Sequence, residues 1–210
     1  VGNDGDPCQP SSGAGTEADP YVFEASIDYF VSDTGYYKFK NCDAVRPVLQ
    51  MKAGSYYKFD QTDLTNWMHP LGFAYYPDGA HKDKDELELG LKPPGSAGSC
   101  DTDESCQSPM YYGGADGTTF LGGAAGDGAF GLDVYEPQFK DWAEGLWSEN
   151  KYSVNLRITD DATAEIFYFC HIHVSHLGPA CVGSRAAREH QWPCEGFMCV
   201  PWVACAVVVG

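Results

Sequence analysis

Tyr168-Phe-Cys-His-Ile-His173 is the stretch on which the fold and function predictions depend, because it ends a strand-like segment with a cysteine and two histidines. A third histidine, His176, follows shortly afterwards. A soft thiolate beside imidazoles suits copper or zinc. If the strand simply continued, Cys170 and His173 would point to opposite faces. They can therefore share an ion only if the chain turns directly after Cys170.

A site of this kind also needs a ligand from a distant part of the chain. His69, which stands between Asn66-Trp-Met68 and Pro70, is the natural candidate, and His176 is a possible fourth ligand. A different interpretation stays open: Cys170 could be an inert buried thiol, which is common for cysteine, in a protein that holds no metal. A catalytic Cys/His pair is disfavoured because no oxyanion glycine motif is present, and we expect no enzyme.

The segments around these residues read as short strands separated by Gly/Pro turns. Strand-like composition occurs at 21–31, 48–51, 55–59, 71–76, 152–158 and 164–170. Ala53-Gly54 predicts a hairpin turn between the second and third of these segments. The modest helix candidate is 138–147, which follows Pro137. This pattern predicts an all-β fold in the form of an antiparallel Greek-key β-sandwich.

Three regions with different compositions are expected along the chain. Residues 1–20 are polar and read as an extended arm held through Cys8, and 21–180 form the sandwich. A long, irregular, glycine-rich insertion is predicted at about 79–135. Residues 181–210 form a tail whose four cysteines imply disulfides. The apolar end of the tail, 206–209, docks either on its own sandwich or on another copy.

Nine cysteines in 210 residues indicate export, because disulfides persist outside the reducing cytosol. The chain has no Cys-x2-Cys pair, which disfavours a zinc ribbon. An odd number leaves one thiol without an intrachain partner. We expect four disulfides and one special cysteine, in an extracellular, secreted or cell-surface protein.

The charge balance excludes one class of partner. Thirteen basic and thirty acidic residues give a formal net charge of −17, which would repel a phosphate backbone, so no nucleic acid is expected. No apolar run approaches the roughly 20 residues of a membrane span. The acidic segment 101–104, between Cys100 and Cys106, is a candidate for structural calcium, although its spacing does not match an EF-hand.

The order of these landmarks resembles the cupredoxin (blue-copper, plastocyanin-like) domain, and most closely the cupredoxin-like modules of marine algal, bacterial and viral surface proteins. The similarity covers about 45–100 and 150–180. It rests on Phe59-Asp-Gln-Thr-Asp63, Asn66, His69-Pro-Leu71, Asp78-Gly79, Gly95-Ser-Ala-Gly98 and Tyr168-Phe-Cys-His-Ile-His173. The resemblance implies one mononuclear copper site with His69, Cys170 and His173 as ligands.

His176 departs from the pattern of those modules, which usually carry methionine at this position. An axial imidazole would draw the ion toward tetrahedral geometry, and a His3Cys set also suits zinc. The expected function is a structural or assembly module of an extracellular fibre, sheath or surface layer that associates with itself or with an extracellular partner. The alternatives are a soluble blue-copper electron-transfer protein and a metal-free relic of that fold.

Overall fold

The chain forms ten short strands, one 3-10 turn and one α-helix in a computed structural model that describes residues 7–44, 46–52, 54–74, 109–123, 131–140, 149–157, 165–170, 172–173 and 206–209. The elements are β1 (Tyr21–Asp28), β2 (Tyr36–Phe39), β3 (Leu49–Met51), β4 (Tyr56–Asp60), η1 (Leu64–Asn66), β5 (Leu71–Ala74), β6 (Met110–Gly113), β7 (Thr119–Gly123), α1 (Leu132–Lys140), β8 (Ser153–Arg157), β9 (Glu165–Cys170) and β10 (Ala206–Val209). The prediction of an all-β chain with little helix is confirmed.

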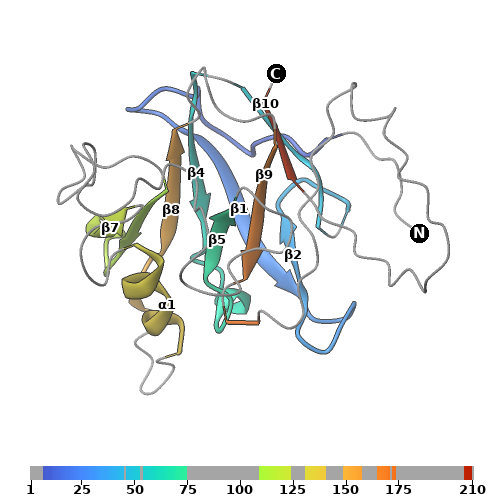
Figure 1. The fold of residues 1–210 in the computed structure, drawn as a ribbon, viewed down its shortest axis with the longest axis vertical. Helices are drawn as coiled ribbons and strands as arrows, with labels where there is room; N and C mark the ends of the chain where they lie inside the picture. The colour runs from blue at the N-terminus through green and yellow to red at the C-terminus, as the bar shows by residue number, and fades with distance from the viewer. Residues whose placement is uncertain are drawn as a thin grey trace, which may run out of the picture.

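These strands make two sheets (Figure 1). One has six strands in the order β2-β1-β4-β8-β6-β7, and the other has four in the order β3-β10-β9-β5. Two pairs, β1 with β4 and β10 with β3, are parallel, so the prediction of purely antiparallel pairing is corrected to a mixed one. The reason is that segments far apart in sequence meet at these pairs, whereas a tight hairpin can join only antiparallel neighbours.

Aromatic rings from the two sheets pack on one another. Phe59 of β4 meets Phe73 of β5 with ring centroids 4.9 Å apart, and Phe39 of β2 meets Tyr168 of β9 at 5.4 Å. All four rings are buried. Burying such rings is the main favourable contribution to folding, and edge-to-face geometry adds to it. The shared core therefore holds the two sheets face to face.

The pattern of alternation in β8 is confirmed where the structure describes it. Val154 and Leu156 are buried and Arg157 is exposed, as one face toward the core requires. Ser153 is buried as well. It pairs with both Asp60 of β4 and Tyr112 of β6, so neighbouring strands cover it on either side.

The predicted hairpin at Ala53-Gly54 is wrong. β3 lies in the four-stranded sheet and β4 in the six-stranded one, so the chain crosses between sheets at this turn. Gly54 adopts φ 74°, which glycine accepts at no steric cost. A sharp turn between two apolar segments has the same local sequence pattern whether the two strands pair with each other or enter different sheets. Which of these occurs depends on pairing partners that lie far away in sequence.

The segment expected to be an irregular insertion contains regular structure. β6 and β7 pair antiparallel within it, and α1 begins at Leu132 rather than at Gln138. Pro137 lies inside the helix and does not start it. The helix holds because Leu132, Tyr135 and Phe139 all face the core, at the spacing of one helical face. Residues 141–148 lie outside the described part of the chain.

Both ends of the described chain join the four-stranded sheet. The prediction that Cys8 holds the arm is confirmed: Cys8 forms a disulfide with Cys42, and its N–H donates to the Val48 carbonyl at 2.7 Å. β10 lies between β3 and β9, so the apolar C-terminal segment docks on its own sheet. The other predicted disulfides and the candidate calcium loop lie outside the described residues. No helix in the described ranges is long and apolar enough to cross a membrane.

Candidate metal centre

His69 is presented by a short polar turn between the two sheets. Asp63 caps η1, and its side chain accepts the Thr65 N–H at 2.9 Å. The His69 N–H then donates to the Asn66 carbonyl at 2.8 Å, and the intervening Met68 adopts a left-handed φ of 64°. This conformation is uncommon for a non-glycine residue and persists only where the surroundings fix it. The turn therefore fixes the direction of the backbone just before β5.

Cys170 ends β9 directly beside the start of β5. Cys170 pairs with Leu71 across the antiparallel ladder, so the residue that follows His69-Pro70 is its neighbour. The chain then turns at Ile172 and His173, as the shared-ion hypothesis requires. His173 Nδ1 comes to 3.4 Å from Cys170 Sγ. The turn after Cys170 is thus confirmed.

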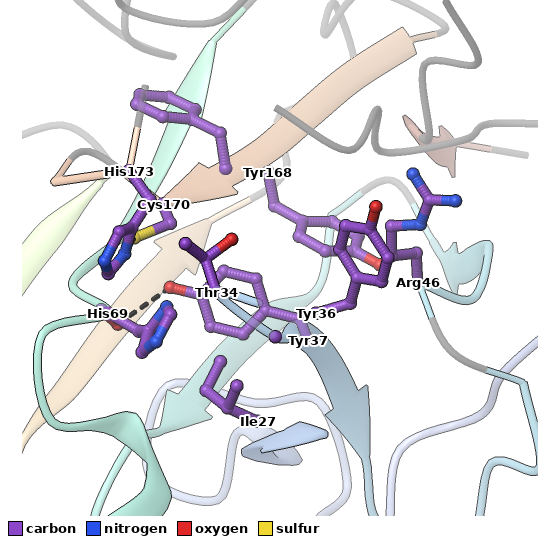
Figure 2. A pocket seen from close by; sticks show the side chains of 11 residues that line it. Ile27, Thr34, Tyr36, Tyr37, Arg46, His69, Tyr168, Cys170 and His173 are labelled. Carbon is purple, nitrogen blue, oxygen red and sulfur yellow. Dashed lines mark hydrogen bonds between the residues drawn. The ribbon is translucent and has the colours of Figure 1, made fainter. Parts of the chain in front are cut away.

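Three of the four predicted ligands come together. His69, Cys170 and His173 each offer one ligand atom, and these atoms lie within 4.8 Å of one another. The two imidazole rings have centroids 4.4 Å apart (Figure 2). The three residues border a cavity of about 30 Å³, enough for one water-sized occupant. This geometry could hold one mononuclear ion.

The surroundings keep His69 neutral. The residue is 3% exposed, and burial, together with the charge of His173, lowers its pKa to about 3. The rings of Tyr29 and Tyr37 stand edge-on to its imidazole, with centroids 5.6 and 6.5 Å away. A neutral imidazole is the form that coordinates metal. His69 therefore needs no proton loss before it can bind an ion at neutral pH.

Cys170 is the free cysteine of the described residues and is half-buried. Burial raises its thiol pKa to about 12, although hydrogen bonds from the backbone of His173 and Ile172 favour the thiolate, and the carboxylate of Glu136 opposes it. Its Sγ lies 3.6 Å from the Met68 carbonyl oxygen. At neutral pH the metal-free residue is a thiol, and an arriving cation would have to displace its proton.

Two residues that sequence reasoning left without a role fix the position of His69. The Gln61 amide donates to the His69 carbonyl at 2.7 Å, and the buried Tyr37 hydroxyl donates to the same oxygen at 2.8 Å. Figure 2 shows the Tyr37 bond as a dashed line. The sequence feature that could have identified Gln61 is the polar segment in which it lies, just before a histidine. Tyr37 lies in an ordinary strand pattern, and no sequence feature marks it as part of the site.

The donor set decides which ions fit. Two imidazoles and one thiolate are the trigonal His2Cys set of copper-thiolate sites, and the same donors with a fourth ligand suit tetrahedral zinc. His176, the predicted fourth ligand, lies outside the described residues, as does His171. The Met68 carbonyl oxygen lies 3.6 Å from the Cys170 sulfur. The residues present therefore fit a borderline-soft transition-metal ion.

Comparisons with known proteins identify no relative of this chain. No family model, curated protein sequence or solved structure matches the chain.

Proposed function

We propose that the protein binds one mononuclear copper-type ion through His69, Cys170 and His173. The convergence of these three ligand atoms within 4.8 Å carries the proposal. They come from two places about 100 residues apart in sequence, brought together by the pairing of β5 with β9. A soft sulfur between two imidazoles favours copper over hard cations, with zinc as the alternative.

We propose that the ion acts as a clip in an exported, cupredoxin-like structural module. An ion that binds only the folded state stabilises it, and the stabilisation grows with the logarithm of the free ion concentration relative to the dissociation constant. His69 precedes β5 and Cys170 ends β9, so the ion would tie the turn between the sheets to the loop after β9. The Cys8–Cys42 disulfide supports an extracellular setting such as a fibre, sheath or surface layer.

The second candidate is an electron carrier. Exposed apolar side chains gather near His69: Tyr29, Phe30, Val31, Leu64 and Trp67. The Tyr29 hydroxyl donates to the Thr65 carbonyl at 2.8 Å, which joins the two exposed segments. Clustered exposed apolar residues are typical of interaction sites. This arrangement would suit a partner that approaches the metal end, and reversible one-electron voltammetry of the copper form would test it.

The test of metal binding is a visible spectrum recorded during Cu²⁺ titration of the natively folded protein. We expect an intense thiolate-to-copper band near ~600 nm that saturates at one equivalent. Cys170→Ser should abolish the band and His69→Ala should abolish or weaken it. Tyr57→Phe, at the opposite end of β4, is the matched control and should bind as the wild type does.

Absence of the band, together with absence of stoichiometric Zn²⁺ uptake, would refute metal binding and leave the metal-free relic. One equivalent of Zn²⁺ bound through Cys170 without a copper band would transfer the proposal to zinc. A band that survives Cys170→Ser would show that the thiolate is not the ligand.

A further inference from the structure

Helix α1 makes direct contact with the turn that carries His69. The Phe139 carbonyl of the helix accepts the Met68 N–H at 3.1 Å. The Tyr135 hydroxyl, one turn earlier, donates to Gln61 Oε1 at 3.0 Å. Both Tyr135 and Phe139 are fully buried. Two hydrogen bonds therefore run from one helix face to the turn.

Gln61 links Tyr135 of the helix to His69 through hydrogen bonds. Its side chain makes four hydrogen bonds: it accepts from Tyr135 and from the Leu71 N–H, and it donates to Asn66 Oδ1 and to the His69 carbonyl. The residue is 0% exposed, so no water replaces a lost partner. A satisfied buried network of this kind fixes one geometry.

A third contact explains why the helix can lie so close to β5. A Cβ on Gly72 would come 2.7 Å from the ring of Phe169 and 3.0 Å from the side chain of Leu132. Glycine thus leaves the space that the first residue of α1 occupies beside the strand following His69. The helix is seated on this strand and is bonded to the turn before it.

We propose that α1 and Gln61 form a positioning element for the metal site, so that docking of the helix and binding of the ion are coupled. This inference rests on the proposed metal binding. Gln61 and Tyr135 touch no ligand atom and act through the His69 backbone. The coupling is reciprocal: a docked helix favours the ion, and the ion favours the docked helix.

The experiment compares Tyr135→Phe with Tyr57→Phe by Zn²⁺ affinity and by amide hydrogen exchange. Each variant removes the hydroxyl of a buried ring and the hydrogen bonding it provides: Tyr135 donates to Gln61, and the Tyr57 oxygen accepts the Lys52 N–H at 2.6 Å. Tyr57 lies at the far end of β4 from Gln61. Gln61→Glu is a second variant, because glutamate keeps the acceptors but loses the donors to Asn66 Oδ1 and to the His69 carbonyl, and it places a carboxylate in a fully buried position.

We expect Tyr135→Phe to weaken Zn²⁺ binding by about 2- to 10-fold, the equivalent of one buried hydrogen bond, and Tyr57→Phe to leave it unchanged. Gln61→Glu, which loses two donors and buries a carboxylate, should weaken Zn²⁺ binding by more than Tyr135→Phe. In metal-free protein, Tyr135→Phe should speed exchange at the Met68 and Leu71 amides, whereas Tyr57→Phe should not. Zn²⁺ should slow exchange within α1 of the wild type.

Equal affinity in Tyr135→Phe and Tyr57→Phe would overturn the coupling. Unchanged exchange at Met68 and Leu71 in metal-free Tyr135→Phe would overturn the positioning role. If wild-type protein takes up no Zn²⁺ or Cu²⁺, the proposed metal binding fails, and the exchange comparison still decides whether the helix orders the His69 turn.

Discussion

Acid should destabilise the metal-free protein through His69. The unfolded chain protonates this histidine below a pKa of about 6.5, whereas burial lowers the folded value to about 3. Between these values the unfolded state binds more protons, so stability is fully present above pH 6.5 and is lost as pH falls toward 3. At pH 5 the 1.5-unit gap from 6.5 corresponds to about 2 kcal/mol, at 1.36 kcal/mol per unit.

The measurement is urea unfolding of metal-free protein at pH 7 and pH 5, followed by circular dichroism. His69→Gln is the reference, because glutamine does not titrate and leaves the backbone hydrogen bonds at position 69 available. Carboxylates elsewhere titrate in both proteins and cancel in the comparison. The wild type should lose about 2 kcal/mol more than His69→Gln on acidification.

Equal losses in the two proteins would refute the reasoning. They would show that His69 is protonated in the folded state at pH 5, and hence that water reaches the imidazole. A larger loss in His69→Gln would reverse the sign and would place an acidic partner beside the histidine.

Three further predictions concern the thiol, the C-terminal strand and the disulfide. Apparent metal affinity should rise about tenfold per pH unit from pH 7 to 9, because the Cys170 thiol must lose its proton first; a flat titration profile would exclude thiolate coordination. Deleting 206–209 should lower the unfolding temperature, since β10 pairs on both sides; a deletion variant that melts like the full chain would contradict that pairing. Replacing Cys8 and Cys42 by alanine should lower the free energy of unfolding by about 3 to 4 kcal/mol, as expected for a closed loop of this sequence separation. Urea unfolding measures this loss, and a value well under 1 kcal/mol would show that the arm remains ordered without the disulfide.

The truncation also tests a choice that the sequence left open and that the strand order makes. An apolar C-terminal segment can dock on its own sheet or on another copy. Its place between β3 and β9 removes the free edge on which assembly through this segment depended.

Most of the strand segments and the ligand trio were accessible from the sequence because their signals are local. Alternation in β8 gave the buried face directly. Cys170, His173 and His69 were identified by donor chemistry and by the need for a turn after β9. The separate sheets of β3 and β4 were not predicted, because their pairing partners, β10 for β3 and β1 and β8 for β4, lie outside this local segment. The helix over Leu132–Lys140 depends on its packing against the core, and β6 and β7, which pair with each other, lie in a glycine-rich segment whose composition indicated irregular structure.

The sequence by itself determined a β-rich, acidic, cysteine-rich chain with a thiol and histidines suited to a soft metal, because composition, alternation and donor type belong to single residues and their neighbours. Only the tertiary structure decided that the sheets are mixed, that β10 is internal, and that α1 reaches the His69 turn through Gln61. The physical reason is that pairing, burial and shared hydrogen bonds join residues far apart in the chain, and no local pattern records which distant partner completes them.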